Sequence, residues 1–203
     1  EKLGAFHFVT AVAHDSLSRI YFDQEDFQKS LDHREQYRSI QAKLFGNSSS
    51  LVAHALYNKA YVLIELGEFE KAEDLASQSL ALFDQQNNLS GQYWAASARA
   101  QARHALGNSK GALADLEKAM RAAEQHRGSF GGGEHGQSAG FSHTYSQAYE
   151  LAIAWQAAAG NVDQAFAAME RNRARGLQNL MAVQGVDLLE GIDEEKAAAL
   201  RRS

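Results

Sequence analysis

The residues in this sequence best suited to chemistry are three histidines and a glutamate in and around a glycine-rich stretch. They are His126, Glu134, His135 and His143, and residues 127–142 contain six glycines. Imidazole and carboxylate groups are common zinc ligands, but this spacing matches no compact ligand pattern, and no lysine follows the glycines as a phosphate-binding loop would require. We therefore interpret the stretch as a surface loop between helices, and we predict no metal and no cofactor.

Nucleophilic catalysis also lacks its usual groups. The sequence contains no cysteine, so a thiolate nucleophile, a thiolate metal site and a disulfide are all excluded within this chain. Neither a GxSxG nor an HExxH motif occurs. We predict that the chain is not an enzyme, and the lack of cysteine fits a cytoplasmic location.

The composition indicates a helical protein with neither a nucleic-acid nor a membrane partner. Proline is absent, and alanine, leucine, glutamine and glutamate are abundant, as long helices require. The formal net charge of −5 argues against a concentrated basic surface for nucleic acid. No apolar run reaches the roughly 18 residues that cross a bilayer. The chain does not begin with methionine, so we expect a fragment of a longer protein.

Residues 53–83 contain the clearest structural pattern, which predicts two antiparallel helices. Apolar residues recur at spacings of three and four up to Gly67 and again after it, as on the buried faces of helices. Gly67 fits the connecting turn, since glycine adopts a positive φ at little cost. Ala60 and Ala72 fall where the two helices would cross, and their small side chains permit a close approach. Phe69, just after the turn, can pack back over the hairpin.

This order of small residue, glycine, aromatic and small residue resembles the tetratricopeptide repeat (TPR). The resemblance implies an all-α fold, a right-handed superhelical array of helix hairpins (an α–α superhelix), and a scaffold for protein–protein interaction. Weaker copies place Ser18 and Ser30 at an earlier crossing, and Ala100 and Ala112 at a later one. From Ser30 to Ala72 to Ala112 the steps are 42 and 40 residues. Such long units resemble the repeats of kinesin light chains and of many bacterial regulatory proteins.

The copies divide the chain into four predicted parts. Three hairpins occupy residues 1–126, the glycine-rich loop residues 127–142, a fourth TPR-like hairpin residues 143–183, and a helical lead-in to a downstream domain residues 184–203. In the first hairpin Glu25 stands at the position of Gly67, which predicts a weaker turn there.

The register of the repeats also predicts a binding groove, because the first helix of each hairpin lines the concave surface of a TPR array. Its residues are, hairpin by hairpin, Val12, Asp15, Arg19 and Phe22, then His54, Tyr57, Tyr61 and Ile64, then Trp94, Ser97, Gln101 and His104. Aromatic side chains contribute a large contact area, so we expect the groove to bind a peptide or a helix of another protein. The alternative is that a segment of the same protein, such as a downstream domain, covers it. The Lys and Asn with which some TPR modules hold chaperone C-termini are replaced by Asp15, Tyr57 and Tyr61, so we expect no chaperone ligand.

An arginine-rich segment lies near the C-terminus. Arg171, Arg173 and Arg175 follow Glu170, and Arg171 and Arg175 share one helix face. A solvated basic face would explain the run without a function. The order of residues 165–182, however, resembles the junction between TPR repeats and a CHAT domain, a caspase-like peptidase module of many bacterial proteins. That resemblance implies a catalytic Cys/His dyad beyond Ser203.

The sequence therefore predicts the TPR recognition region of a larger bacterial signalling protein, in which the groove binds a protein or a peptide. Three alternatives stay open. They are a scaffold that self-associates through its end helices into a homo-oligomer, a TPR sensor attached to a different effector domain, and an enzyme that uses the loop histidines.

Overall fold

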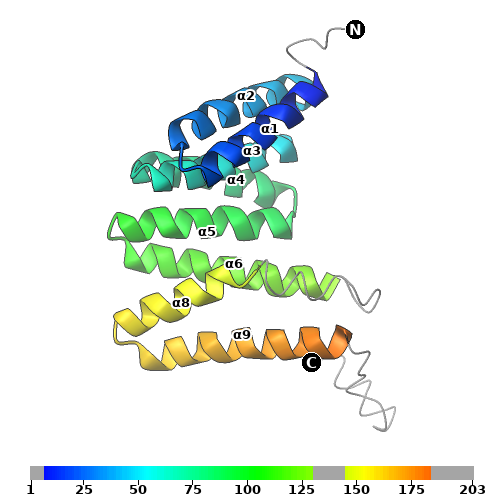
Figure 1. Cartoon of the computed structure of the whole chain (residues 1–203). Coiled ribbons are helices and arrows are strands. Elements are labelled where there is room, and N and C mark those ends of the chain that lie inside the picture. Colours follow the sequence, from blue (N-terminus) through cyan, green and yellow to red (C-terminus); the bar gives the residue numbers. More distant parts are fainter. Residues whose placement is uncertain (1–6, 130–144, 184–203) are drawn as a thin grey trace. The chain divides into compact units, whose positions relative to one another are not determined.

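The computed structural model describes residues 7–129 and 145–183, in which there are eight helices and no strand (Figure 1). The chain divides into two compact units, Glu1–Ser129 and Phe130–Ser203. The first unit contains α1 (Phe8–Asp23), α2 (Phe27–Phe45), α3 (Ser50–Glu65), α4 (Phe69–Gln85), α5 (Leu89–Ala105) and α6 (Ser109–Ser129), and the second contains α8 (Gln147–Ala158) and α9 (Val162–Val183). The all-α fold predicted from the sequence is confirmed.

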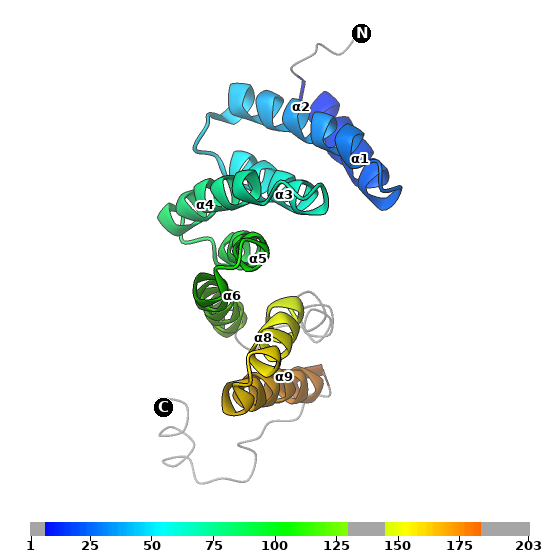
Figure 2. The same cartoon turned by 90° about the vertical axis from the view of Figure 1, so that its left-hand side faces the viewer.

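The first unit is a stack of three antiparallel hairpins, α1–α2, α3–α4 and α5–α6. Each hairpin packs on the next, α2 against α3 and α4 against α5, and α3 also contacts α5. Figure 2 shows α1, α3 and α5 on one side of this stack and α2, α4 and α6 on the other. Stacking buries the apolar face that each hairpin alone would expose, which is the construction principle of an α–α superhelix.

The six small residues predicted at the helix crossings are all fully buried. They are Ser18, Ser30, Ala60, Ala72, Ala100 and Ala112. In the first hairpin the Oγ of Ser30 donates a hydrogen bond to the carbonyl oxygen of Ser18 at 2.9 Å, and the two Oγ atoms lie 3.1 Å apart. The serines therefore satisfy their hydroxyl groups within the crossing and act as small residues there. All six predicted crossing positions are thus occupied by buried small residues.

The turns inside the hairpins share one backbone conformation. Gly67 and Gly107 have φ of 75° and 80°, and Glu25 at the equivalent position has φ of 61°. In each turn this residue donates its N–H to a carbonyl three residues earlier, and the next residue donates to one five residues earlier. Glu25 keeps the hydrogen bonds of the turn, and the left-handed conformation costs a non-glycine residue about 1–2 kcal/mol.

A carboxylate at the joint between the first two hairpins is held by two cations. Glu35 of α2 accepts hydrogen bonds from Arg38, one turn later on α2, and from the Nζ of Lys59 on α3. These contacts, that of Arg38 first, lower the pKa of Glu35 from 4.5 to about 2. The ionised form of Glu35 is therefore the one that joins α2 to α3.

This pairing predicts a pH-dependent difference between the wild type and Glu35→Gln. Because the pKa of Glu35 is lowered on folding, its contribution to stability is present above about pH 4.5 and disappears as the pH falls towards 2. The carboxylate is partly exposed, so solvent screening reduces the expected loss in the variant to about 1 kcal/mol at pH 7. Urea midpoints measured between pH 7 and pH 3 would test this. A gap between the two proteins that stays constant over that range would contradict it.

The second unit consists of the α8–α9 hairpin, whose turn residue Gly160 has φ of 77°. The helical lead-in predicted for residues 184–203 lies outside the described residues, as does most of the glycine-rich stretch. The first three residues of that stretch are an exception, because α6 continues through Ser129. Residues 127–129 contain one glycine, which a helix of 21 residues tolerates at a cost of about 1 kcal/mol.

Across residues 7–129 and 145–183, no helix has both the length and the apolar character that a membrane crossing demands.

Candidate functional site

The predicted groove residues of α1 follow one another along a single face of the helix. Val12 and Arg19 are exposed, and Asp15 and Phe22 are half-buried. Their spacing of three and four residues matches the helix period and places all four on one face of α1, and three of them, Asp15, Arg19 and Phe22, line a pocket on this side.

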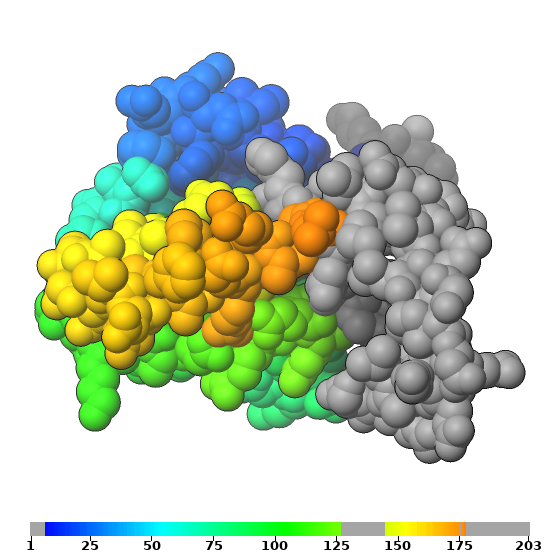
Figure 3. Space-filling model, turned by 90° about the horizontal axis from the view of Figure 1, so that it is seen from below, coloured from blue at the N-terminus to red at the C-terminus, as the bar shows by residue number. Residues whose placement is uncertain are grey.

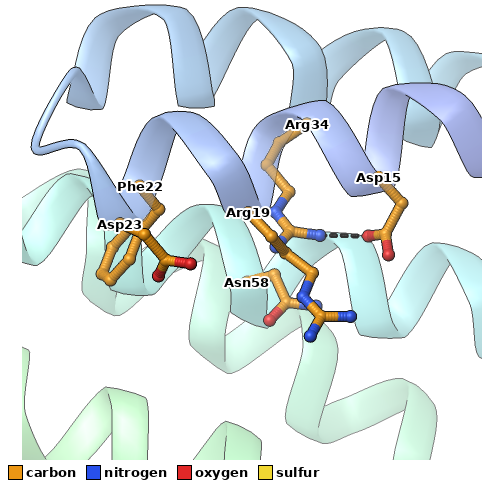
Figure 4. Close-up of a pocket in the computed structure, with 6 residues that line it drawn as sticks. All are labelled: Asp15, Arg19, Phe22, Asp23, Arg34 and Asn58. Atoms are coloured by element: carbon orange, nitrogen blue, oxygen red, sulfur yellow. Dashed lines mark hydrogen bonds and ion pairs between the residues drawn. The ribbon is translucent and has the colours of Figure 1, made fainter.

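A surface pocket of about 440 Å³ opens on this side of the first two hairpins. Its lining residues are Asp15, Arg19, Phe22, Asp23, Arg34 and Asn58 (Figure 4). Asp15, Arg19 and Phe22 belong to the predicted groove, whereas the other three were missed by the sequence reasoning. The position of Asp23, one helical turn after Arg19, is a signal that could have found it. Arg34 lies on the second helix of its hairpin, where the repeat register predicts no groove residue.

Arg34 is a buried cation at the edge of this pocket. Its residue exposure is 6%, and its Nη1 donates a hydrogen bond to a carboxylate oxygen of Asp15. Figure 4 shows this pair reaching from α2 to α1. The Nε of Arg34 is buried without a hydrogen-bond partner, and burial lowers the pKa of its guanidinium despite the opposing effect of Asp15. One carboxylate therefore compensates the buried positive charge only in part.

Arg19 and Asp23 are two further charged residues that line the pocket. The side chains of Arg19 and Asp23 are exposed, and neither makes an ion pair or hydrogen bond with any residue that the structure describes. Asn58 of α3, half-buried, also has no such hydrogen bond. The pocket thus offers an uncompensated guanidinium, a carboxylate and an amide to a ligand.

The predicted groove aromatics of α3 pack largely on one another. The Nδ1 of His54 and the hydroxyl of Tyr57 lie 3.2 Å apart, and the His54 ring meets that of the buried Phe83 edge to face with centroids 5.0 Å apart. Burial lowers the pKa of His54. The rings of Tyr57 and Tyr61 also meet edge to face, with centroids 6.2 Å apart. These residues form a continuous aromatic surface on α3.

Tyr61 and its neighbours join α3 to α5. The hydroxyl of Tyr61 donates to the carbonyl oxygen of Trp94 at 3.4 Å, and burial raises the pKa of Tyr61 well above its ordinary value. Tyr61 and Ile64 both pack against the apolar cluster around Ala60. Their contribution to a binding surface is therefore limited to the edge that remains accessible.

The groove positions of α5 differ in their exposure. Ser97 is fully buried and presents no surface, Trp94 and Gln101 are half-buried, and His104 is exposed. The amide nitrogen of Gln101 donates to the carbonyl oxygen of Ser97 at 3.4 Å. Exposed polar character on this face is thus greatest on α1, in and beside the pocket.

The arginine-rich segment lies in the middle of α9. Arg171 is half-buried with its guanidinium over the Tyr149 ring, 6.0 Å from the centroid, and Arg173 donates to Glu170 at 3.2 Å. Of the predicted loop ligands, Glu134, His135 and His143 lie outside the described residues. Within the described residues, no group of three or more metal-ligating side chains comes together.

Comparison with known proteins supports the repeat interpretation. Residues 9–85, which span the first two hairpins, match the family described as tetratricopeptide repeat. No curated protein matches the chain.

Solved structures show the same fold. The chain is similar to BtubC (BKLC) from P. vanneervenii, with a TM-score of 0.67 and 19% identity over 88% of this chain and 66% of that one, just under two thirds of its length. It is also similar to a Podosopora anserina protein described as a kinesin light chain with nearly identical TPR-like repeats, with a TM-score of 0.56 and 20% identity over 87% of this chain and 80% of that one. At these identities the likeness shows the fold alone.

Proposed function

We propose that this chain is a protein-binding module of a larger cytoplasmic protein, without catalytic activity, that binds an extended segment of another protein along α1, α3 and α5. TPR repeats in general mediate protein–protein interaction, and residues 9–85 match that family. The observation that carries the proposal is the pocket between α1, α2 and α3, whose free polar groups adjoin exposed apolar surface at Val12. A ligand that fits this face is a peptide with apolar and charged side chains in alternation.

The free charge of the pocket suggests which side chain it receives. Arg19 lacks a partner and Arg34 is only partly compensated, so a carboxylate of the ligand would gain charge-assisted hydrogen bonds there. Asp23 opposes this, since its own carboxylate is unpaired. An acidic ligand should therefore lose affinity when Arg19 is neutralised and gain affinity when Asp23 is neutralised.

Selection of a displayed library of random peptides on the purified chain would test this. We expect enriched peptides to carry Asp or Glu beside an apolar residue and to bind Arg19→Gln about tenfold or more weakly, because a hydrogen bond to a charged group contributes about 1.5–3 kcal/mol. Asp23→Asn should bind the same peptides more tightly. Arg121→Gln on the opposite layer, at an exposed position of α6, is the matched control and should bind as the wild type does. Enrichment of basic peptides, or no loss with Arg19→Gln, would contradict the proposal.

We retain the larger context proposed from the sequence, a bacterial signalling protein with a CHAT domain after Ser203. Its support is the residue order of 165–182 in α9. The downstream reading frame is the observation that decides it. A Cys and a His in a caspase-like α/β pattern would support the proposal, and a different effector domain would replace it.

Self-association is a second candidate function, favoured by one feature of α9. Val162, Phe166, Met169 and Leu177 are exposed at spacings that place them on one face of the helix. Figure 3 views the second unit from the side of α9. Light scattering over a concentration series separates the two candidates, because a monomer at high concentration removes self-association.

A further inference from the structure

The first hairpin contains a pair of histidines that the proposed binding face does not use. His14 of α1 and His33 of α2 are both half-buried, and their Nδ1 atoms lie 2.8 Å apart. They are 19 residues apart in the sequence, and the packing of α1 on α2 brings them together.

The geometry of the two rings is that of a hydrogen bond and not of a metal site. Their centroids are 5.1 Å apart, which exceeds the distance between the Nδ1 atoms by about the two ring radii. Both Nδ1 atoms therefore lie close to the line between the centroids and face one another directly. Two ligands of one metal ion would instead direct their lone pairs at a common third point. The space between the rings holds one proton, in an N–H···N hydrogen bond.

The number of protons on the pair decides whether this bond can exist. When both rings are neutral, one Nδ1 carries a proton and donates it to the other. A further proton on the outer Nε2 of the donor ring leaves the bond intact and adds charge assistance. The Tyr21 ring stacks on His33, with centroids 5.4 Å apart and planes 5° from parallel, and its face accommodates a cationic imidazole. A second extra proton has to bind the accepting Nδ1, so it breaks the bond and brings two cations into contact.

The surroundings do not neutralise a doubly charged pair. The carboxylates nearest in sequence, Asp15 and Asp32, each already accept a hydrogen bond from another side chain. On α2, which is the helix packed against α1, the nearby titratable groups are Lys29 and Arg34, which are cations, and Tyr37, which packs with Ala11. The Nζ of Lys29 lies over the Tyr21 ring, 5.3 Å from its centroid, and is paired with Asp26, so neither charge of that pair is left to compensate a second imidazolium.

We propose that His14 and His33 form a pH-sensitive latch, which holds α1 on α2 while the pair carries at most one extra proton and releases α1 when both rings are cationic. The first hairpin then has two arrangements, one closed and one with α1 detached, and the number of protons on the histidine pair sets the balance between them. Because Asp15, Arg19 and Phe22 are on α1, release removes one wall of the pocket between α1, α2 and α3. This consequence for ligand binding rests on the proposed function, whereas the latch itself does not.

The direction of the titration agrees with this geometry. Burial lowers the pKa of His14 below its ordinary value of 6.5, and the neighbouring His33 lowers it further. As the pH falls through about 6.5, His14 of an unfolded chain therefore takes up a proton, whereas His14 of the closed hairpin does so only at lower pH. As a result the free energy of opening decreases as the pH falls below about 6.5.

Hydrogen exchange of the α1 amides, expressed as protection factors, tests the latch in the full chain without any ligand. Between pH 7.5 and pH 5 we expect protection across α1 to fall about tenfold or more while that of α5 changes little. In His14→Asn the amide oxygen can still accept from His33, but the side chain takes up no proton, so the fall should disappear. His126→Asn, which removes a half-buried histidine of α6 whose pKa is also lowered by burial, is the matched control and should leave the fall in α1 protection as in the wild type.

The outcomes are separable from those of the peptide experiment. Protection of α1 that is equal at both pH values in the wild type would overturn the latch, as would an undiminished fall in His14→Asn. Should His14→Asn not fold, the reciprocal His33→Asn removes the second proton in the same way and carries the same expectation. A failure of peptide binding to depend on Arg19 leaves these exchange rates unaffected, and the reverse also holds.

Discussion

Replacing Asp115 by alanine is expected to lower the free energy of unfolding of the first unit by about 3–5 kcal/mol, the cost of breaking a buried ion pair from one side. Asp115 of α6 is 3% exposed. One of its carboxylate oxygens accepts from Arg99 Nη2 at 2.6 Å, and the other from Arg99 Nε and Arg103 Nη1, both at 2.9 Å. The substitution removes three charge-assisted hydrogen bonds and leaves two guanidinium groups close together with less compensation.

Urea unfolding followed by circular dichroism would measure this loss. Lys118→Ala on the same helix is the matched control, since it breaks an exposed pair with Asp84, which at the protein surface contributes no more than about 1 kcal/mol. Asp115→Asn keeps the shape and one acceptor, so an intermediate loss is expected. If Asp115→Ala lost no more stability than Lys118→Ala, the ion pairs of Asp115 would contribute no more than one exposed ion pair does. That result would contradict the prediction.

The position of this network explains why its effect should extend over several helices. Arg103 also donates to Glu73 of α4 at 2.7 Å, so Asp115, Arg103 and Glu73 connect α6, α5 and α4. In a repeat array, stability depends on the interfaces between neighbouring units as well as on the units themselves. The network supplies a polar contribution to the interface between the second and third hairpins, beside the alanine-rich contact of α4 with α5.

The crossings and turns were predictable from the sequence because their requirements are local and recur in each hairpin. Small residues at Ala60 and Ala72 are demanded by the close approach of two helices, and Gly67 by the positive φ of the turn between them. The same offsets then located Ser18 and Ser30, although serine is not a typical core residue. Because the pattern recurs, the clear second hairpin identified the crossing residues of the first hairpin, whose own pattern is weaker.

The pocket and the latch were not predictable in the same way, because they depend on which helix covers which. Helix periodicity predicted which face of α3 carries Tyr61. Whether that face stays exposed depends on where α5 packs, and a backbone carbonyl of α5 accepts a hydrogen bond from the Tyr61 hydroxyl. Arg34 acquires its role only when α2 places it opposite Asp15. His14 and His33 form no motif in the sequence, and their contact follows from the packing of α1 on α2.

A second large loss of stability is expected from Gly91→Ala, at the start of α5. Alanine is favoured over glycine in a helix by about 0.5–1 kcal/mol, so the backbone alone would make this change stabilising. A Cβ at this position, however, would lie closer than 3.0 Å to three ring atoms of Phe83, which is fully buried on α4. The ring is confined by the edge-to-face contact with His54. Forcing the ring or α5 to move should give a net destabilisation of about 1–3 kcal/mol.

A double-mutant cycle separates this clash from any other effect at Gly91. Phe83→Ala removes the three ring atoms that an added Cβ at Gly91 would meet, and alone it should destabilise the chain, because it leaves space that the neighbours of Phe83 fill only in part. In that background Gly91→Ala no longer meets ring atoms, so its cost should vanish or turn into the small gain that helix propensity predicts. Equal costs in the two backgrounds, from urea midpoints, would show that Phe83 is not the obstacle. Gly176→Ala in α9, where an added Cβ meets nothing within 4 Å, should be neutral or stabilising, because there only the helix preference acts.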